Sequence, residues 1–90
     1  MADKVPDSIR KQNLGSVTLI IAEFTTTNID DNDTWTSGIL PGKIISWPKC
    51  VPKLDGPQDF AIDAIDATGV MTFGSAANQE GYVEVMVKEM

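Results

Sequence analysis

The clearest pattern of hydrophobic and polar positions lies in the last third of the chain. Residues 60–65 and 70–73 are two apolar runs, and residues 66–69 between them carry a turn sequence that ends in glycine. After a short loop, residues 82–89 alternate strictly between apolar and polar positions. Apolar runs and alternating segments separated by turns are typical of antiparallel strands.

The alternation in the last segment also predicts which way its side chains face. Val83, Val85 and Val87 share one parity, and Glu84, Met86 and Lys88 share the other. Because successive side chains of a strand point to opposite faces, we expect the three valines to face the core.

Residues 16–27 predict a longer strand, since they are rich in β-branched and aromatic residues. Both parities are apolar in its middle: Val17, Leu19 and Ile21 on one, and Ile20, Ala22 and Phe24 on the other. Such a strand is central and covered on both sides, or its second face meets another subunit. We assign the parity of Ile20 to the less protected face.

The middle of the chain predicts short strands and loops. Residues 28–33 form a polar, acidic loop, and residues 34–36 and 43–47 are two strand candidates separated by a Pro-Gly turn signal. Three prolines punctuate residues 48–58. Because proline lacks the backbone donor that a strand ladder needs, we expect a loop over that segment.

Residues 1–13 predict an N-terminal arm. Val5 and Ile9 are its sizeable apolar side chains, and Pro6 and Asp7 stand where one turn of helix could begin. Because so few apolar groups do not offset the entropy of ordering the segment, a flexible, extended arm is the alternative to that turn.

These elements predict an all-β fold, a small antiparallel β-sandwich or barrel of about six to seven strands with a flexible N-terminal arm. A chain of 90 residues with 42% hydrophobic residues builds one core. We therefore expect an arm over residues 1–13 and a single β domain over residues 14–90.

The charge of the chain limits its partners. Thirteen acidic and seven basic residues give a net charge of −6, which repels phosphate backbones, so we expect no nucleic-acid partner. The longest apolar run, residues 19–22, is too short to cross a bilayer, and the polar start resembles no secretory signal. We expect synthesis in the cytoplasm and no membrane partner, and the single Cys50 forms no internal disulfide.

Candidate catalytic groups are few. The sequence has no histidine, which removes the commonest general base and metal ligand. Cys50 lies between two lysines, which favour a thiolate, but it has no base to activate it. Asp59, Asp63 and Asp66 offer carboxylates, yet the first two alternate with apolar residues as solvent-facing strand positions do. We predict no enzyme, no catalytic residues and no cofactor.

The acidic loop has calcium-type ligands at the wrong spacing. Residues 28–33 hold three aspartates and two asparagines. Counted from Asp30, the sixth position is Trp35 instead of glycine and the twelfth is Pro41 instead of glutamate. We expect a turn held by its own side chains and no metal site.

Three segments together resemble a known class of protein. These are the strand start at residues 15–18, the acidic turn that leads into residues 33–38, and the hairpin at residues 66–73, all following a polar arm. In this order they resemble small virion proteins of tailed bacteriophages, particularly the β-sandwich capsid decoration or cementing proteins. The resemblance implies a structural protein of the virion that binds a capsid or other virion protein, as a homo-oligomer.

We therefore expect a non-enzymatic structural or interaction protein. The side chains expected to contact a partner are Val5, Ile9, Ile20, Phe24, Trp35 and Trp47. Two alternatives stay open: a small acidic inhibitor that mimics DNA, and a carbohydrate- or calcium-binding β module that uses Trp35, Trp47 and the acidic loop.

Overall fold

The structure is a computed structural model that describes residues 2–53, 60–75 and 78–88, with the backbone alone at residues 26 and 27. Its elements, in chain order, are β1 Ser8–Asn13, β2 Val17–Ile29, β3 Thr34–Thr36, the 3-10 turn η1 Pro41–Lys43, β4 Ile44–Pro52, β5 Phe60–Ile65, β6 Val70–Ser75 and β7 Gln79–Lys88.

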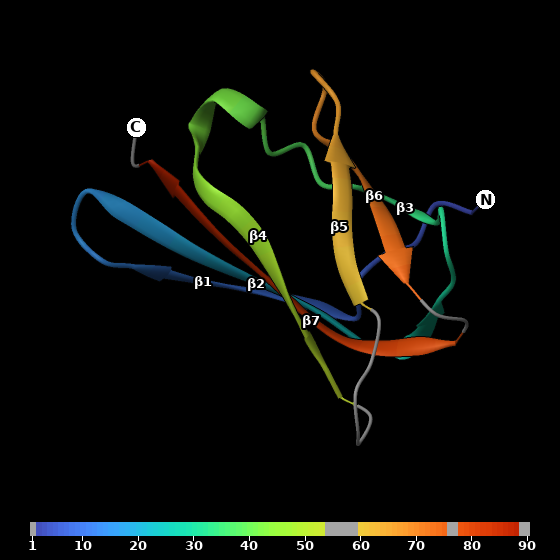
Figure 1. Ribbon diagram of the computed structural model, residues 1–90. Coiled ribbons are helices and arrows are strands. Elements are labelled where there is room, and N and C mark those ends of the chain that lie inside the picture. The colour runs from blue at the N-terminus through green and yellow to red at the C-terminus, as the bar shows by residue number, and fades with distance from the viewer. Residues whose placement is uncertain (1, 54–59, 76–77, 89–90) are drawn as a thin grey trace.

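The strands form two antiparallel sheets that face each other (Figure 1). One sheet has four strands in the order β1-β2-β7-β4, and the other has three strands in the order β3-β6-β5. The all-β prediction is confirmed, and of its two forms the fold is a small sandwich.

Aromatic rings join the two sheets at the centre of the core. Phe24 of β2 contacts Trp35 of β3 and Phe73 of β6 edge-on, with ring centroids 5.6 Å and 5.5 Å apart. Phe60 of β5 stacks on Phe73 at 5.8 Å. Such pairs add about 0.5–1.5 kcal/mol each beyond the area that they bury.

The faces of β2 differ from our expectation. Ile20, Ala22 and Phe24 point inward, and Ile20 is only 8% exposed. The assignment of Ile20 to the less protected face was therefore wrong. The physical reason lies in the pairing with β7, where Ile20 is opposite the buried Val85, so that both side chains point toward the second sheet.

The other parity of β2 faces outward. Leu19 and Ile21 are half-buried there, opposite Met86 and Glu84 of β7. Long neighbouring side chains on the same face shield part of this apolar surface.

The N-terminal segment belongs to the sandwich in this structure. Ser8–Asn13 forms β1, so the turn of helix considered there is not observed. Residues 2–4 pair with the other sheet: Thr34 N–H donates to the carbonyl of Ala2 at 2.8 Å, and Lys4 N–H donates to that of Thr34 at 2.6 Å. All side chains of β1 are exposed. The backbone ladder therefore holds this strand, and apolar burial does not.

The loop expected over residues 48–58 begins later than predicted. β4 continues to Pro52 and includes Pro48, and residues 54–59 lie outside the described residues. β4 is an edge strand with register shifts on both sides of Ser46. Edge strands and bulges tolerate proline because one side of their backbone has no ladder.

The turn predicted at residues 66–69 is confirmed. Asp66 Oδ1 accepts hydrogen bonds from the backbone N–H of Thr68 at 2.9 Å and of Val70 at 3.0 Å. Gly69 adopts φ +90°, and a Cβ there would lie 2.8 Å from backbone atoms of residues 38 and 39. The turn therefore packs closely on the segment before η1.

Candidate functional site

The six predicted contact residues divide into two groups. The three in the core are Ile20, Phe24 and Trp35. The three at the surface are Val5, Ile9 and Trp47. The three core residues are packed in the hydrophobic cluster and expose little surface to a partner, whereas the other three are accessible. Trp35 and Trp47 both lie in short strand candidates of the sequence, but the fold buries Trp35 and leaves Trp47 at the surface.

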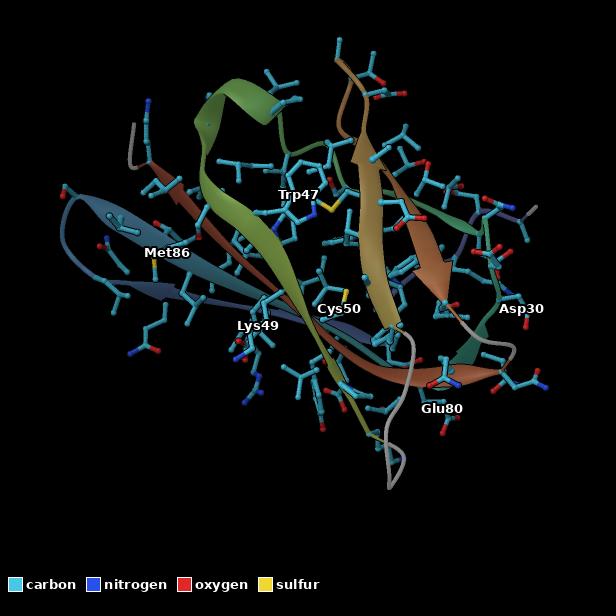
Figure 2. All side chains as sticks on the ribbon, in the orientation of Figure 1. Asp30, Trp47, Lys49, Cys50, Glu80 and Met86 are labelled. Atoms are coloured by element: carbon cyan, nitrogen blue, oxygen red, sulfur yellow. The ribbon has the colours of Figure 1, made fainter. Side chains whose placement is uncertain are left out.

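Trp47 is the largest of the three surface residues. The residue is 57% exposed, and its Nε1–H donates a hydrogen bond of 2.7 Å to the backbone carbonyl of Ile62 in β5. Figure 2 shows the side chain extending from β4 toward β5. The bond connects the edge strands of the two sheets and fixes the orientation of the ring.

An apolar surface surrounds this indole. A shallow pocket of about 150 Å³ is lined by Trp47, Ile45, Pro41 and Ile65, together with Ile44 and Ser46. We call the first four residues the Trp47 surface. Ile45 is 46% exposed, although isoleucine is usually buried. Contiguous exposed apolar groups mark contact sites for other proteins.

The sequence carried a weak signal for the rest of this surface. Residues 44–48 are apolar in both parities and end in a proline. A proline inside a strand indicates an edge or a bulge. The register shifts around Ser46 interrupt the regular alternation of β4, and such bulges re-aim side chains.

The acidic loop uses its carboxylates within the fold. Asp33 is buried and accepts hydrogen bonds from the backbone N–H of Asp30 at 2.8 Å and of Ala2 at 3.0 Å. Asp31 Oδ1 accepts from Ser75 N–H at 3.3 Å, and Asp30 Oδ1 accepts from Asn78 N–H at 2.9 Å. These bonds tie the β2–β3 connection to the N-terminal segment, to β6 and to the residue before β7.

The environment of Asp33 favours its charged form. Burial alone would raise the pKa of this carboxyl, but the backbone donors of Asp30 and Ala2 and the charge of Lys4 lower it below its ordinary value of 3.8. The Lys4 ammonium lies 3.7 Å from Asp33 Oδ2. The residue thus acts as a structural anion, which matches the expectation of a turn held by its own side chains.

The other candidate chemical groups do not come together. Burial raises the pKa of the half-buried Cys50 thiol to about 12, which disfavours the thiolate form that a nucleophile needs. Asp63 is exposed within β5, Asp66 is exposed in the turn that follows it, and Asp59 lies outside the described residues.

Metal, membrane and carbohydrate sites would each need a feature of its own: grouped ligands, a long apolar helix or an exposed aromatic platform. Among residues 2–53, 60–75 and 78–88, no three histidine, cysteine or acidic side chains group as metal ligands would. No helix in this part of the chain has the length and hydropathy to span a bilayer. Because Trp35 is buried, it forms no exposed aromatic platform with Trp47.

Comparisons with known proteins do not identify a family for this chain. No protein-family model, curated protein or solved structure matches this chain.

Proposed function

We propose that this chain is a non-enzymatic interaction protein that binds other protein chains through the Trp47 surface. The observation that carries the proposal is Trp47, which is 57% exposed and whose indole is held by its hydrogen bond to Ile62. Tryptophan is among the residues most enriched at the energetic centres of protein interfaces.

The fixed orientation of the ring favours binding. A side chain that is already held in one rotamer loses little conformational entropy when a partner covers it. The adjacent Ile45, Pro41 and Ile65 supply apolar area around the ring. Burial of such area contributes about 25 cal/mol per Å².

The free edges of the four-stranded sheet favour side-chain contacts over strand addition. β1 carries Arg10 and Lys11, and β4 contains Pro48 and Pro52. Charges and prolines on edge strands oppose pairing with another chain. A partner therefore has better access to the Trp47 surface than to a backbone ladder.

More specifically, we propose that the chain is a bacteriophage capsid decoration or stabilising protein. The sequence resemblance supports this role. It implies that the partner is a capsid or other virion protein and that the chain associates with itself. The lack of histidine and the raised pKa of Cys50 support a non-enzymatic role.

Self-association tests the proposal with a matched pair of variants. Ile45→Arg places a charge on the Trp47 surface, and Leu14→Arg places the same charge in the β1–β2 turn, where Leu14 is 48% exposed. Native mass spectrometry and sedimentation velocity should show oligomers for the wild type and for Leu14→Arg, and monomers for Ile45→Arg. A wild-type monomer over the whole concentration range, or equal association of the two variants, would contradict the proposal.

A further inference from the structure

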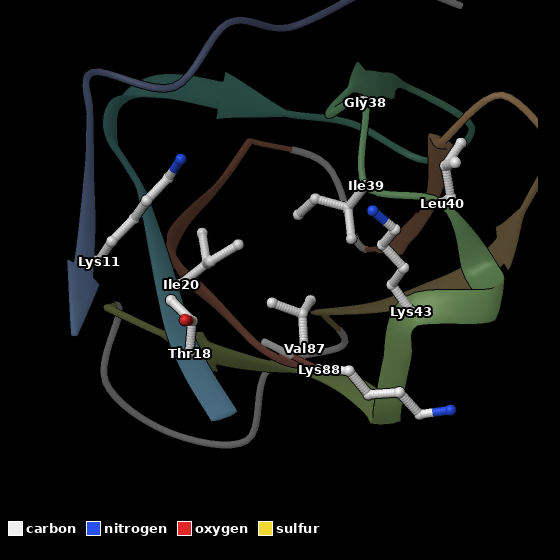
Figure 3. Close-up of a pocket in the computed structure, with 9 residues that line it drawn as sticks. All are labelled: Lys11, Thr18, Ile20, Gly38, Ile39, Leu40, Lys43, Val87 and Lys88. Atoms are coloured by element: carbon white, nitrogen blue, oxygen red, sulfur yellow. The ribbon is translucent and has the colours of Figure 1, made fainter. Parts of the chain in front are cut away.

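A second pocket lies at the other side of η1, where the four-stranded sheet extends past the three-stranded one. It has a volume of about 370 Å³ and is bounded by the inner face of β1, β2 and β7 and by the segment that precedes β4 (Figure 3). Ile20, Ile39 and Val87 form its apolar floor. It shares no lining residue with the Trp47 surface.

The rim of this pocket is basic. Lys11, Lys43 and Lys88 line it, which is three of the seven basic residues in a chain of net charge −6. They come from β1, η1 and β7. In Figure 3, Lys11 and Lys43 stand on opposite sides of the floor, and Lys88 extends away from its lower edge.

These positive charges have no described counter-charge. Within the part of the chain that the structure describes, no carboxylate lies within ion-pair distance of Lys11, Lys43 or Lys88. Protection of the β1 edge explains a lysine at position 11. It does not explain the other two, which lie on different elements and line the same pocket.

The register of the strands explains why a lysine and the apolar floor lie on the same face of the sheet. Lys11 lies opposite Ile20 in the β1–β2 ladder, so both side chains are on the inward face of the sheet. Thr18 lies opposite Val87 in the β2–β7 ladder and extends that face toward the rim. Nothing from the three-stranded sheet lines this end, so the pocket is open to solvent.

We propose that this pocket binds an amphiphilic anion, an acidic head group on a short unbranched aliphatic tail. The tail covers Ile20, Ile39 and Val87, and the head group lies between the ammonium groups of Lys11 and Lys43. Small-molecule pockets are commonly of this size and kind, largely apolar with a few convergent polar groups. The charge opposes binding of cationic ligands of the same length.

Chain length and charge of the ligand give the first test. Hexanoate, octanoate and decanoate, each below its micelle concentration, are titrated into the isotope-labelled wild type and followed by amide NMR shifts. Affinity should rise about two- to fourfold per added methylene until the floor is covered. Shifts should concentrate at Thr18, Ile39 and Val87. Decyltrimethylammonium should bind at least about fivefold more weakly than decanoate.

Variants locate the site and control for net charge. Lys43→Glu should weaken decanoate binding by about threefold or more, while Lys53→Glu, which makes the same change in charge away from the pocket, should leave it unchanged. Ile39→Ser, at a half-buried position outside the strands, should weaken binding and lessen its dependence on chain length. Circular dichroism confirms that each variant is folded.

Vesicles identify the source of the ligand. If phosphatidylglycerol vesicles compete with decanoate, the anion is a lipid; if they do not, it is a free amphiphile, and both results support the site. The proposal is overturned if decanoate causes no shifts, if the cationic ligand binds equally well, if the shifts fall on the Trp47 surface, or if the two lysine variants behave alike.

Discussion

The ring of Phe60 lies directly against Gly81, so closely that a Cβ on Gly81 would be 2.9 Å from the ring carbon Cε2. This contact connects β5 of one sheet to β7 of the other. Gly81 is buried and also lies opposite Pro52 of β4, whose Cα would be 3.0 Å from the added Cβ. The absence of a side chain at residue 81 therefore allows three strands to meet.

Gly81→Ala should destabilise the fold strongly. The added Cβ would overlap the backbone carbonyl of Val51, which cannot rotate away as a side-chain end would. We expect a loss of about 1–3 kcal/mol or more, as for other overpacked cores. Urea denaturation measures it.

Gly42→Ala is the matched control, because nothing lies within 4 Å of a Cβ at Gly42. Its free energy of unfolding should stay within about 0.5 kcal/mol of the wild type. Equal effects of the two substitutions would show that the close approach at Gly81 does not determine stability.

Asp33→Asn should lower stability in a pH-dependent way. The backbone donors and Lys4 outweigh the effect of burial and hold the pKa of Asp33 below 3.8, so the unfolded chain binds a proton more readily. The stabilisation is therefore present above pH 4 and is lost as pH falls through the folded-state pKa. At neutral pH we expect Asp33→Asn to lose about 1–3 kcal/mol.

The difference between Asp33→Asn and the wild type should shrink below pH 4, as measured by urea denaturation across pH. Asp63→Asn serves as control, since Asp63 is exposed and accepts none of the hydrogen bonds of the described residues. A difference that is independent of pH would mean that the charge of Asp33 is not what stabilises the loop.

The two tryptophans should differ in fluorescence. Trp35 is 3% exposed and Trp47 is 57% exposed. Trp47→Phe leaves Trp35 as the emitter, so emission should move to shorter wavelength and resist quenching by acrylamide. Trp35→Phe should leave an emission at longer wavelength that acrylamide quenches readily. If both single-tryptophan variants quench alike, the assignment of Trp47 to the surface is wrong.

The parts of the fold that were predictable are those with local signals. The turn at residues 66–69 followed from its aspartate and glycine, and the inward valines of β7 followed from strict alternation. The faces of β2 were not predictable, because both parities are apolar there and only pairing with β7 decides which one is covered.

The N-terminal strand and the pocket lacked such signals for a different reason. β1 is held by backbone hydrogen bonds, which the pattern of side chains does not encode. Lys11, Lys43 and Lys88 are far apart in sequence and meet only through sheet register and the position of η1. Likewise, nothing local distinguishes Trp35 from Trp47.

Cys50 should be unreactive in the folded protein. Its side chain lies on the inward face opposite Val83 and packs against the core, and burial raises its pKa to about 12. Only the thiolate attacks common thiol reagents, so at pH 8 the folded chain should react at least about tenfold more slowly than the urea-unfolded chain. A colorimetric disulfide reagent measures both rates.

As control, an Ala61→Cys substitution in a Cys50→Ala background places the thiol at an exposed position of β5. This thiol should react almost as fast in the folded chain as in the unfolded chain. If folded wild type and this control react at the same rate, Cys50 is more accessible than its packing indicates.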